Sequence, residues 1–389
     1  MRVRRRTSLA LGLLVLAATG YLALHDYVRG AAFVIQAAGM QGPARTVAEW
    51  TTDDVAESST GVPWRGGTLR GRVYRPGRNE GPATLLVPGV HAGGIDEPRL
   101  VQFARDVAGT GRTVVTAEVP DLKQYRVTPQ ATDMIEDAVR WLSDQPDLRG
   151  DGRVGMMGIS FAGGLSVVAA GRPSLRDRVA FVMSFGGHGN LPRTLRYLCG
   201  GSSRDSQPPP HDYGVAIVLL GVADRVVPAP QVQPLREAIQ AFLHASHVDM
   251  IDKPRAQVEF ARAKSMAEAL DDPARTLMRH VNDRDVARLG PILLPHASAL
   301  GGDAALSPEN APPPAAPVYL LHGTDDNVIP AIESKLLGDA LSARGVRVRY
   351  LATPLITHAE VDRAAAARAT WDLVAFWANL LDEGQGIFD

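Results

Sequence analysis

The stretch GRVGMMGISFAGGLS, residues 152–166, places Ser160 between small residues where an apolar, strand-like run changes to a helix-like one. A hydroxyl at the tip of a sharp strand-to-helix turn needs small neighbours two positions before and after it, and Gly158 and Ala162 meet that need. The N-terminus of the following helix would place free N–H groups and partial positive charge beside the hydroxyl. The stretch therefore predicts a nucleophilic serine, with a polar turn residue as the alternative.

Strand and helix patterns alternate on both sides of this stretch, from about residue 65 onward. Short apolar runs at 83–89 and 112–120 are typical of buried parallel strands. Between them, the residues 98–111 carry apolar side chains at helical spacing and end on glycine. Strands separated by helices of this length predict the α/β class, with a doubly wound and mostly parallel sheet.

Two proline-rich stretches, 202–211 and 307–317, interrupt this alternation and bracket a region with mostly helical patterns. We expect a largely helical cap insertion over 201–315. It would divide the core into a first part, 41–200, and a second part, 316–389.

The first 40 residues predict a signal anchor and a juxtamembrane segment. Four arginines lie between residues 2 and 6, and an uncharged, mostly apolar run follows from 8 to 24. The run is near the short end of what spans a bilayer as a helix, and residues 31–40 continue as a helical pattern. We expect a single transmembrane helix in a bacterial inner membrane with the catalytic domain outside the cytoplasm, and cleavage as a signal peptide is the alternative.

The segment GISFAGG resembles the G-x-S-x-G nucleophile elbow of the α/β-hydrolase superfamily, with Ala162 in place of the second glycine. The stretch before and through the elbow is most similar to the dienelactone-hydrolase and prolyl-oligopeptidase members. In this superfamily the acid and the histidine follow the serine in that order. HGTDDNVIP, residues 322–330, resembles the acid loop and implies Asp326, while THAE resembles the histidine loop and implies His358.

Two other aspartates are alternatives for the acid. Asp325 is adjacent to Asp326, and Asp224 follows a second apolar run, at 213–222, that also predicts a strand. A triad with Asp224 would place the helical insertion between acid and base, so Asp326 is preferred.

The resemblance also implies an oxyanion hole. One donor is the N–H of Phe161, directly after the nucleophile, and the other comes from the loop VPGVHAGGID, where Val90 is preferred to His91. His91 and His188 are possible substrate contacts, although both have structural alternatives.

Other classes of function are disfavoured. The formal net charge is -1, with no basic stripe, so nucleic-acid binding is not expected. No cysteine pair, metal-ligand spacing or phosphate loop is present, so we expect no metal and no cofactor. The single cysteine, Cys199, is expected to be an inert thiol.

The resemblance implies acyl transfer to Ser160 and hydrolysis of a small carboxylic ester. A serine peptidase or amidase of the prolyl-oligopeptidase type is the alternative enzyme, and a non-catalytic membrane-anchored binding protein is the alternative outside catalysis. The sequence does not predict the oligomeric state.

Overall fold

The computed structural model describes residues 25–78, 81–148, 152–200, 208–249, 251–356 and 363–383. The predicted anchor, residues 8–24, and the predicted base, His358, lie outside these ranges. Within the described part of the chain, no helix combines the length and the apolar character needed to cross a bilayer.

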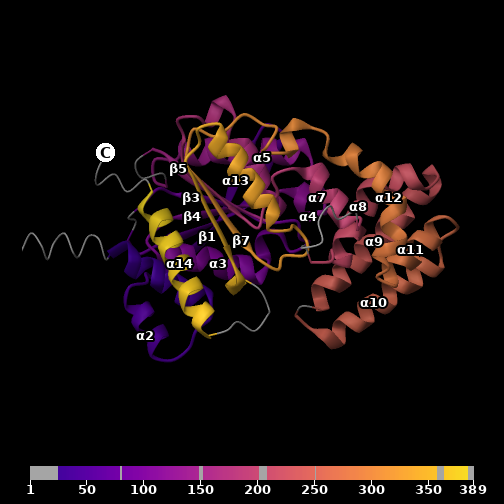
Figure 1. Ribbon diagram of the computed structural model, residues 1–389, viewed down its shortest axis with the longest axis horizontal. Helices are drawn as coiled ribbons and strands as arrows, with labels where there is room; N and C mark the ends of the chain where they lie inside the picture. Colours follow the sequence, from indigo (N-terminus) through magenta and orange to yellow (C-terminus); the bar gives the residue numbers. More distant parts are fainter. Residues whose placement is uncertain are drawn as a thin grey trace, which may run out of the picture.

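The described residues contain an eight-stranded sheet with the order β1-β2-β4-β3-β5-β6-β7-β8 (Figure 1). β2 pairs antiparallel with β1 and β4, and the remaining neighbours are parallel. The predicted α/β class with a mostly parallel sheet is therefore confirmed. The strands are β1 (Val55–Trp64), β2 (Gly67–Pro76), β3 (Thr84–Val87), β4 (Val114–Ala117), β5 (Val154–Ile159), β6 (Val179–Phe185), β7 (Val318–Gly323) and β8 (Val348–Thr353).

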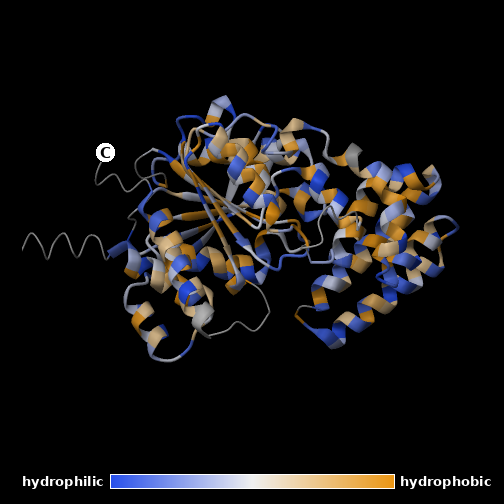
Figure 2. Cartoon of the chain, viewed as in Figure 1, coloured by the Kyte–Doolittle hydropathy of each residue, from blue (hydrophilic) through white to orange (hydrophobic). Residues whose placement is uncertain are grey.

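Helices bury both faces of the sheet, and consecutive strand residues, which point to opposite sides, belong to two different cores. In β3, Leu85 joins the core on one side and Leu86 the core on the other, and Met156 and Met157 divide in the same way in β5. Helices α5, α6 and α13 cover the first side, and α3, α14 and the helical residues 25–37 cover the second. Figure 2 shows hydrophobic residues along the strands and on the helix sides that face them. The bounds of these and neighbouring helices are α2 (Pro43–Trp50), α3 (Pro98–Gly109), α4 (Pro120–Lys123), α5 (Pro129–Ser143), α6 (Phe161–Ala170), α7 (Leu191–Leu198), α13 (Ile332–Ala343) and α14 (Arg363–Asp382).

A helical cap lies between β6 and β7 in the sequence and forms one end of the molecule (Figure 1). Its helices are α8 (Asp212–Val226), α9 (Ala229–Asp249), α10 (Lys253–Glu268), α11 (Ala274–Asn282) and α12 (Val286–Gly301), and the short turn η3 (Ala304–Leu306) follows. The strand predicted at 213–222 is wrong, because these residues belong to α8. This helix packs against α7, α9 and α12, and a helix buried on all sides has no polar face that would distinguish it from a buried strand.

The predicted juxtamembrane segment is part of the folded domain. Residues 25–37 are helical and pack against α14, with the ring of Phe33 centred 4.0 Å from that of Trp377. A Cβ added at Gly30 would lie 2.8 Å from the carbonyl oxygen of Val374, so the two helices touch backbone to backbone. This helix is therefore fixed to the core rather than a free connector.

Candidate active site

Ser160 occupies a strained turn between β5 and α6. Its φ of 56° and ψ of -133° lie in a region that non-glycine residues rarely adopt. The N–H of Ser160 donates to the carbonyl of Phe185 at 2.7 Å, and its own carbonyl accepts from the N–H of Gly163 at 2.8 Å. The backbone is thus held on both sides of the serine, as expected of a nucleophile elbow.

The small residues around Ser160 are required by contact. A Cβ at Gly158 would lie 2.3 Å from the carbonyl oxygen of Ala162, and one at Gly163 would lie 2.4 Å from Oγ of Ser184. Ala162 belongs to α6 and lacks the positive φ that favours glycine. Its methyl group is fully buried in the helix packing, which explains why alanine fits where the superfamily pattern has glycine.

Two backbone N–H groups are available beside the serine. Among the described residues, neither the N–H of Phe161 nor that of Val90 donates to an acceptor. Phe161 opens α6, and the first N–H groups of a helix have no partner within it. Gly89 brings the other loop close, since a Cβ at that position would lie 3.3 Å from Cβ of Ser160. Within the described ranges, both predicted oxyanion donors therefore have no acceptor at this edge of the sheet.

His91 is engaged elsewhere. The backbone N–H of His91 donates to the carbonyl of Leu122 at 3.2 Å, so this N–H is not available as an oxyanion donor. Its Nδ1 accepts from the N–H of Gly93 at 3.1 Å, so the neutral ring carries its proton on Nε2, which lies 2.7 Å from Nδ1 of His247 in α9. Burial, with a smaller contribution from His247, lowers the pKa of His91 to about 4. The ring is a neutral link between the core and the cap.

Asp326 lies in the turn after β7, at the same edge of the sheet as Ser160. Its Oδ1 accepts from the N–H groups of Val328 and Ile329, both at 2.9 Å. A Cβ at Gly186, directly after the neighbouring strand β6, would lie 3.4 Å from Oδ2 of Asp326. The backbone bonds hold Oδ1, and they leave Oδ2 for another donor.

The positions of the two alternative acids, Asp325 and Asp224, favour a catalytic role less than that of Asp326. Asp325 is exposed to solvent. Asp224 lies in the last turn of α8, is 58% exposed and pairs with Arg236 at 3.5 Å. The prediction that Asp224 follows a strand is wrong, because the run before it is a cap helix.

His322 supports the acid turn, a role that was not predicted. Its ring is fully buried, donates from Nε2 to the carbonyl of Ile329 at 2.7 Å, and lies at 2.7 Å from the hydroxyl of Ser334 through Nδ1. The same Nε2 is 3.6 Å from Oδ2 of Asp326. The histidine at the head of the motif HGTDDNVIP was the only signal in the sequence.

The chain enters the predicted histidine loop next to Asp326. The short turn η4 (Pro354–Ile356) follows β8 and lies close to Gly323, the last residue of β7. A Cβ added to Gly323 would lie 3.3 Å from the carbonyl oxygen of Ile356. His358 follows two residues later, outside the described residues. The loop thus begins at the edge that carries Asp326.

The His188 ring is 0% exposed, so its burial gives no support to the predicted substrate contact. The ring is fully buried beneath α6, with Nε2 donating to the carbonyl of Leu306 at 2.7 Å. Its centre lies 5.5 Å from that of Phe161, and a Cβ at Gly164 would lie 2.5 Å from its Cε1. Burial lowers the pKa of His188, which favours the neutral ring. The position of His188 under α6 indicates a packing role.

Glu333 holds the loop after β6 and was also not predicted. This carboxylate is 1% exposed and accepts from the N–H groups of Gly189 and Asn190 at 3.0 Å each. Arg193 bridges Glu333 and Glu309, with Nε–Oε1 and Nη2–Oε1 distances of 2.5 and 2.6 Å. Because these contacts join distant segments, no local pattern indicates them.

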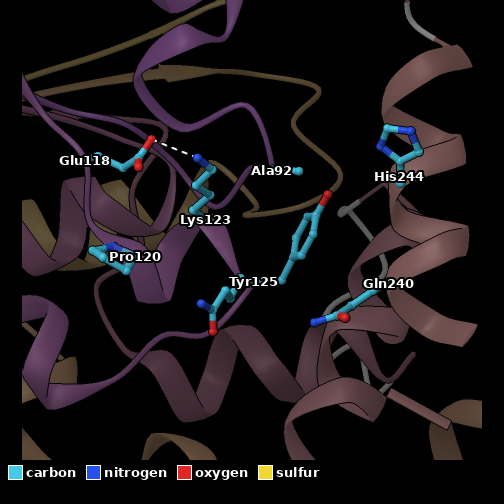
Figure 3. A pocket seen from close by; sticks show the side chains of 8 residues that line it. Ala92, Glu118, Pro120, Lys123, Tyr125, Gln240 and His244 are labelled. Atoms are coloured by element: carbon cyan, nitrogen blue, oxygen red, sulfur yellow. Dashed lines mark hydrogen bonds and ion pairs between the residues drawn. The ribbon is translucent and has the colours of Figure 1, made fainter. Parts of the chain in front are cut away.

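A cavity of about 490 Å³ opens between the core and the cap (Figure 3). Gln240 and His244 of α9 face Tyr125 and Ala92 of the core across it. Ala92 lies two residues after Val90 on the same loop, and neither Val90 nor Ser160 is part of the lining. The full lining is Ala92, Glu118, Pro120, Lys123, Gln124, Tyr125, Gln240 and His244.

A metal-ligand cluster or a reactive cysteine among the described residues would be an alternative kind of site. Within the described ranges, no three histidine, cysteine or acidic side chains gather closely enough to hold a metal ion. Cys199 is buried, and burial raises the pKa of its thiol to about 11, which disfavours the thiolate.

Residues 110–186, from the end of α3 to the loop after β6, match the family model of X-Pro dipeptidyl-peptidase (S15 family). Comparison with curated proteins gave no match. Among solved structures, an esterase of Pyrobaculum calidifontis is 15% identical, with 92% of each chain covered and a TM-score of 0.45. A brefeldin A esterase, a bacterial homologue of human hormone sensitive lipase, is 15% identical over 90% of this chain and 85% of that one, with a TM-score of 0.47. An acylaminoacyl peptidase of Pyrococcus horikoshii is 12% identical over 90% of this chain and 45% of that one, with a TM-score of 0.46.

Proposed function

We propose that this protein is a serine hydrolase that cleaves carboxylic esters. The observation that carries the proposal is the backbone of Ser160, which is held in a strained left-handed conformation at the start of a helix. Strain of this kind costs free energy and is concentrated at functional sites, so it supports a functional role for Ser160. The free N–H groups of Phe161 and Val90 supply the electrostatic partner that acyl transfer needs.

In the proposed reaction, Ser160 Oγ attacks the ester carbonyl carbon while His358 takes the hydroxyl proton. Asp326 orients and stabilises the protonated histidine. The carbonyl oxygen becomes an oxyanion bound by the two free N–H groups. The intermediate collapses, the alcohol leaves with the proton from His358, and an acyl-serine ester forms. Water then attacks this ester, again with His358 as base, and releases the acid.

The runner-up enzyme is a serine peptidase or amidase. The match of residues 110–186 to the S15 peptidase family supports it. The two enzymes differ in the leaving group, since an amine must be protonated as it departs whereas an ester alcohol is a better leaving group. A panel of p-nitrophenyl esters beside aminoacyl and prolyl p-nitroanilides separates them by their kcat/KM values.

The proposal is tested with Ser160→Ala and a matched control, Ser166→Ala, six residues further along the same helix. Ser160→Ala is expected to abolish both ester hydrolysis and labelling by a fluorophosphonate probe, while Ser166→Ala retains both. Circular dichroism establishes that each variant is folded. Undiminished labelling of Ser160→Ala would refute the assignment, and a folded wild-type protein without hydrolysis or labelling would favour a binding protein.

We further propose that residues 8–24 anchor the protein in a membrane, with the catalytic domain outside the cytoplasm. The arginines before this run and its lack of charge support the proposal. Carbonate-washed membranes should retain the full-length chain, and protease added from the outside should digest the domain. Recovery of a shortened chain in the soluble fraction would instead indicate cleavage as a signal peptide.

A further inference from the structure

Two side chains of the cap contact the loop after β3, which carries the oxyanion donor. The hydroxyl of Tyr213, in the first turn of α8, donates to the carbonyl of Val90 at 3.3 Å. One residue further, Nε2 of His91 lies 2.7 Å from Nδ1 of His247 in α9. Two different cap helices therefore hold consecutive residues of one core loop.

The surroundings of Tyr213 stabilise its hydrogen bond to the carbonyl of Val90. The ring packs edge-on against that of Tyr125, with centres 6.0 Å apart, which fixes its direction. Burial raises the pKa of Tyr213 well above its usual value, so the hydroxyl keeps the proton that it donates. The partner carbonyl belongs to a residue that is 8% exposed, where an unmade hydrogen bond is costly.

The loop needs such support, because its sequence makes it deformable. Gly89 and Gly93 flank Val90 and His91, and glycine restricts the backbone least. An oxyanion donor acts only if it is already aimed at the charge when the charge develops. A displacement of about 1 Å can reduce a rate by about 100-fold, so contacts that fix the aim of the Val90 N–H, in addition to the bond from the His91 N–H to Leu122, should affect the rate.

We propose that the cap completes the oxyanion hole: Tyr213 and His247 are positioning residues that hold the loop so that the Val90 N–H points at Ser160. This inference rests on the proposed function, in which Val90 is a donor. The cap is then part of the catalytic machinery, besides being a cover over it.

The same cap helix also lines the cavity. Gln240, His244 and His247 follow one another at intervals of four and three residues, which places them along one side of α9. Figure 3 shows the first two facing the cavity, while the third holds His91. A group that fills the cavity would therefore contact the helix that also holds the loop.

The test compares Tyr213→Phe with Tyr319→Phe in the full-length protein. Tyr319 is the control because it is a buried tyrosine whose hydroxyl also bonds across the fold, far from the loop: it donates to Oε1 of Glu383 at 2.7 Å and lies 3.1 Å from the carbonyl of Asn379. For a p-nitrophenyl ester, Tyr213→Phe should lower kcat by about 10- to 100-fold, somewhat less than the loss of an entire oxyanion donor, with KM changed less than about twofold. A trifluoromethyl ketone, whose adduct with the serine carries an oxyanion, should bind more weakly by the same factor.

Tyr319→Phe should change stability but leave kcat and the inhibitor constant as in the wild type. Equal losses of kcat in the two variants, or an unchanged kcat in Tyr213→Phe, would overturn the inference. Failure of the proposed function has a different signature, namely equal rates for the wild type and Ser160→Ala, and it would remove the inference as well. Hydrogen exchange gives a readout independent of turnover, because the peptide that contains residues 89–93 should exchange faster in Tyr213→Phe alone.

Discussion

Replacement of Ser160 by glycine should stabilise the protein relative to its replacement by alanine, although both variants lack the nucleophile. The φ of 56° and ψ of -133° at this residue cost about 1–3 kcal/mol for any side chain with a Cβ. Glycine removes that cost, but it loses about 0.4–1 kcal/mol to the greater freedom of the unfolded chain. The balance predicts that Ser160→Gly is more stable than Ser160→Ala by about 1 kcal/mol.

The assay is urea unfolding of four variants, with Ser166→Ala and Ser166→Gly as the matched pair. Ser166 lies in α6 and lacks the positive φ of Ser160, so glycine there should be less stable than alanine by about 1 kcal/mol. The sign of the alanine-to-glycine change should therefore reverse between the two sites. If glycine is the less stable substitution at both, the elbow stores no strain and the argument from Ser160 fails.

Three further predictions concern the acid, the cap contact and the loop after β6. Asp326→Asn should lower kcat/KM by about 10³- to 10⁴-fold through loss of the charge that orients the base, whereas Asp325→Asn should stay near the wild type. Burial lowers the pKa of His91 from 6.5 in the unfolded chain to about 4 in the folded protein. The contribution of His91 to the free energy of unfolding is therefore complete above pH 6.5 and is lost as the pH falls toward 4. His91→Gln should flatten the pH dependence of the free energy of unfolding in that window, and an unchanged slope would contradict the assignment. Glu333→Ala should cost about 2–4 kcal/mol in urea unfolding, because the N–H groups of Gly189 and Asn190 lose their acceptor while Arg193 keeps Glu309; a loss below about 1 kcal/mol would count against this role.

The sequence predicted the sheet where strands are buried on both faces. β3, β4 and β7 are short apolar runs with every residue buried, and that pattern is visible without a structure. β1 was not predicted, because it is a polar edge strand that is fixed by its pairing with β2. The apolar run at 213–222 was misassigned for the opposite reason, since burial on all sides hides the helical period.

The residues of the candidate site also fall into those that the sequence predicted and those that it did not. Ser160 and Asp326 lie in short motifs whose turns are set by local chemistry, so neighbouring residues were enough to indicate them. The contact between Tyr213 and Val90 joins residues more than a hundred positions apart, and only the folded chain shows that they meet. Catalytic groups were therefore predictable where local backbone geometry defines them, while their supporting groups were not.

The packing of residues 25–37 on α14 determines how the domain would sit on a bilayer. If residues 8–24 anchor the chain in a membrane as proposed, the helix at 25–37, which packs on α14, follows them directly in the sequence. A domain linked this closely to an anchor would sample a narrower range of tilt and stand-off distance than one on a long flexible tether. Its substrates would have to reach the lipid surface, and the direction from which they arrive would be set by a helix–helix contact.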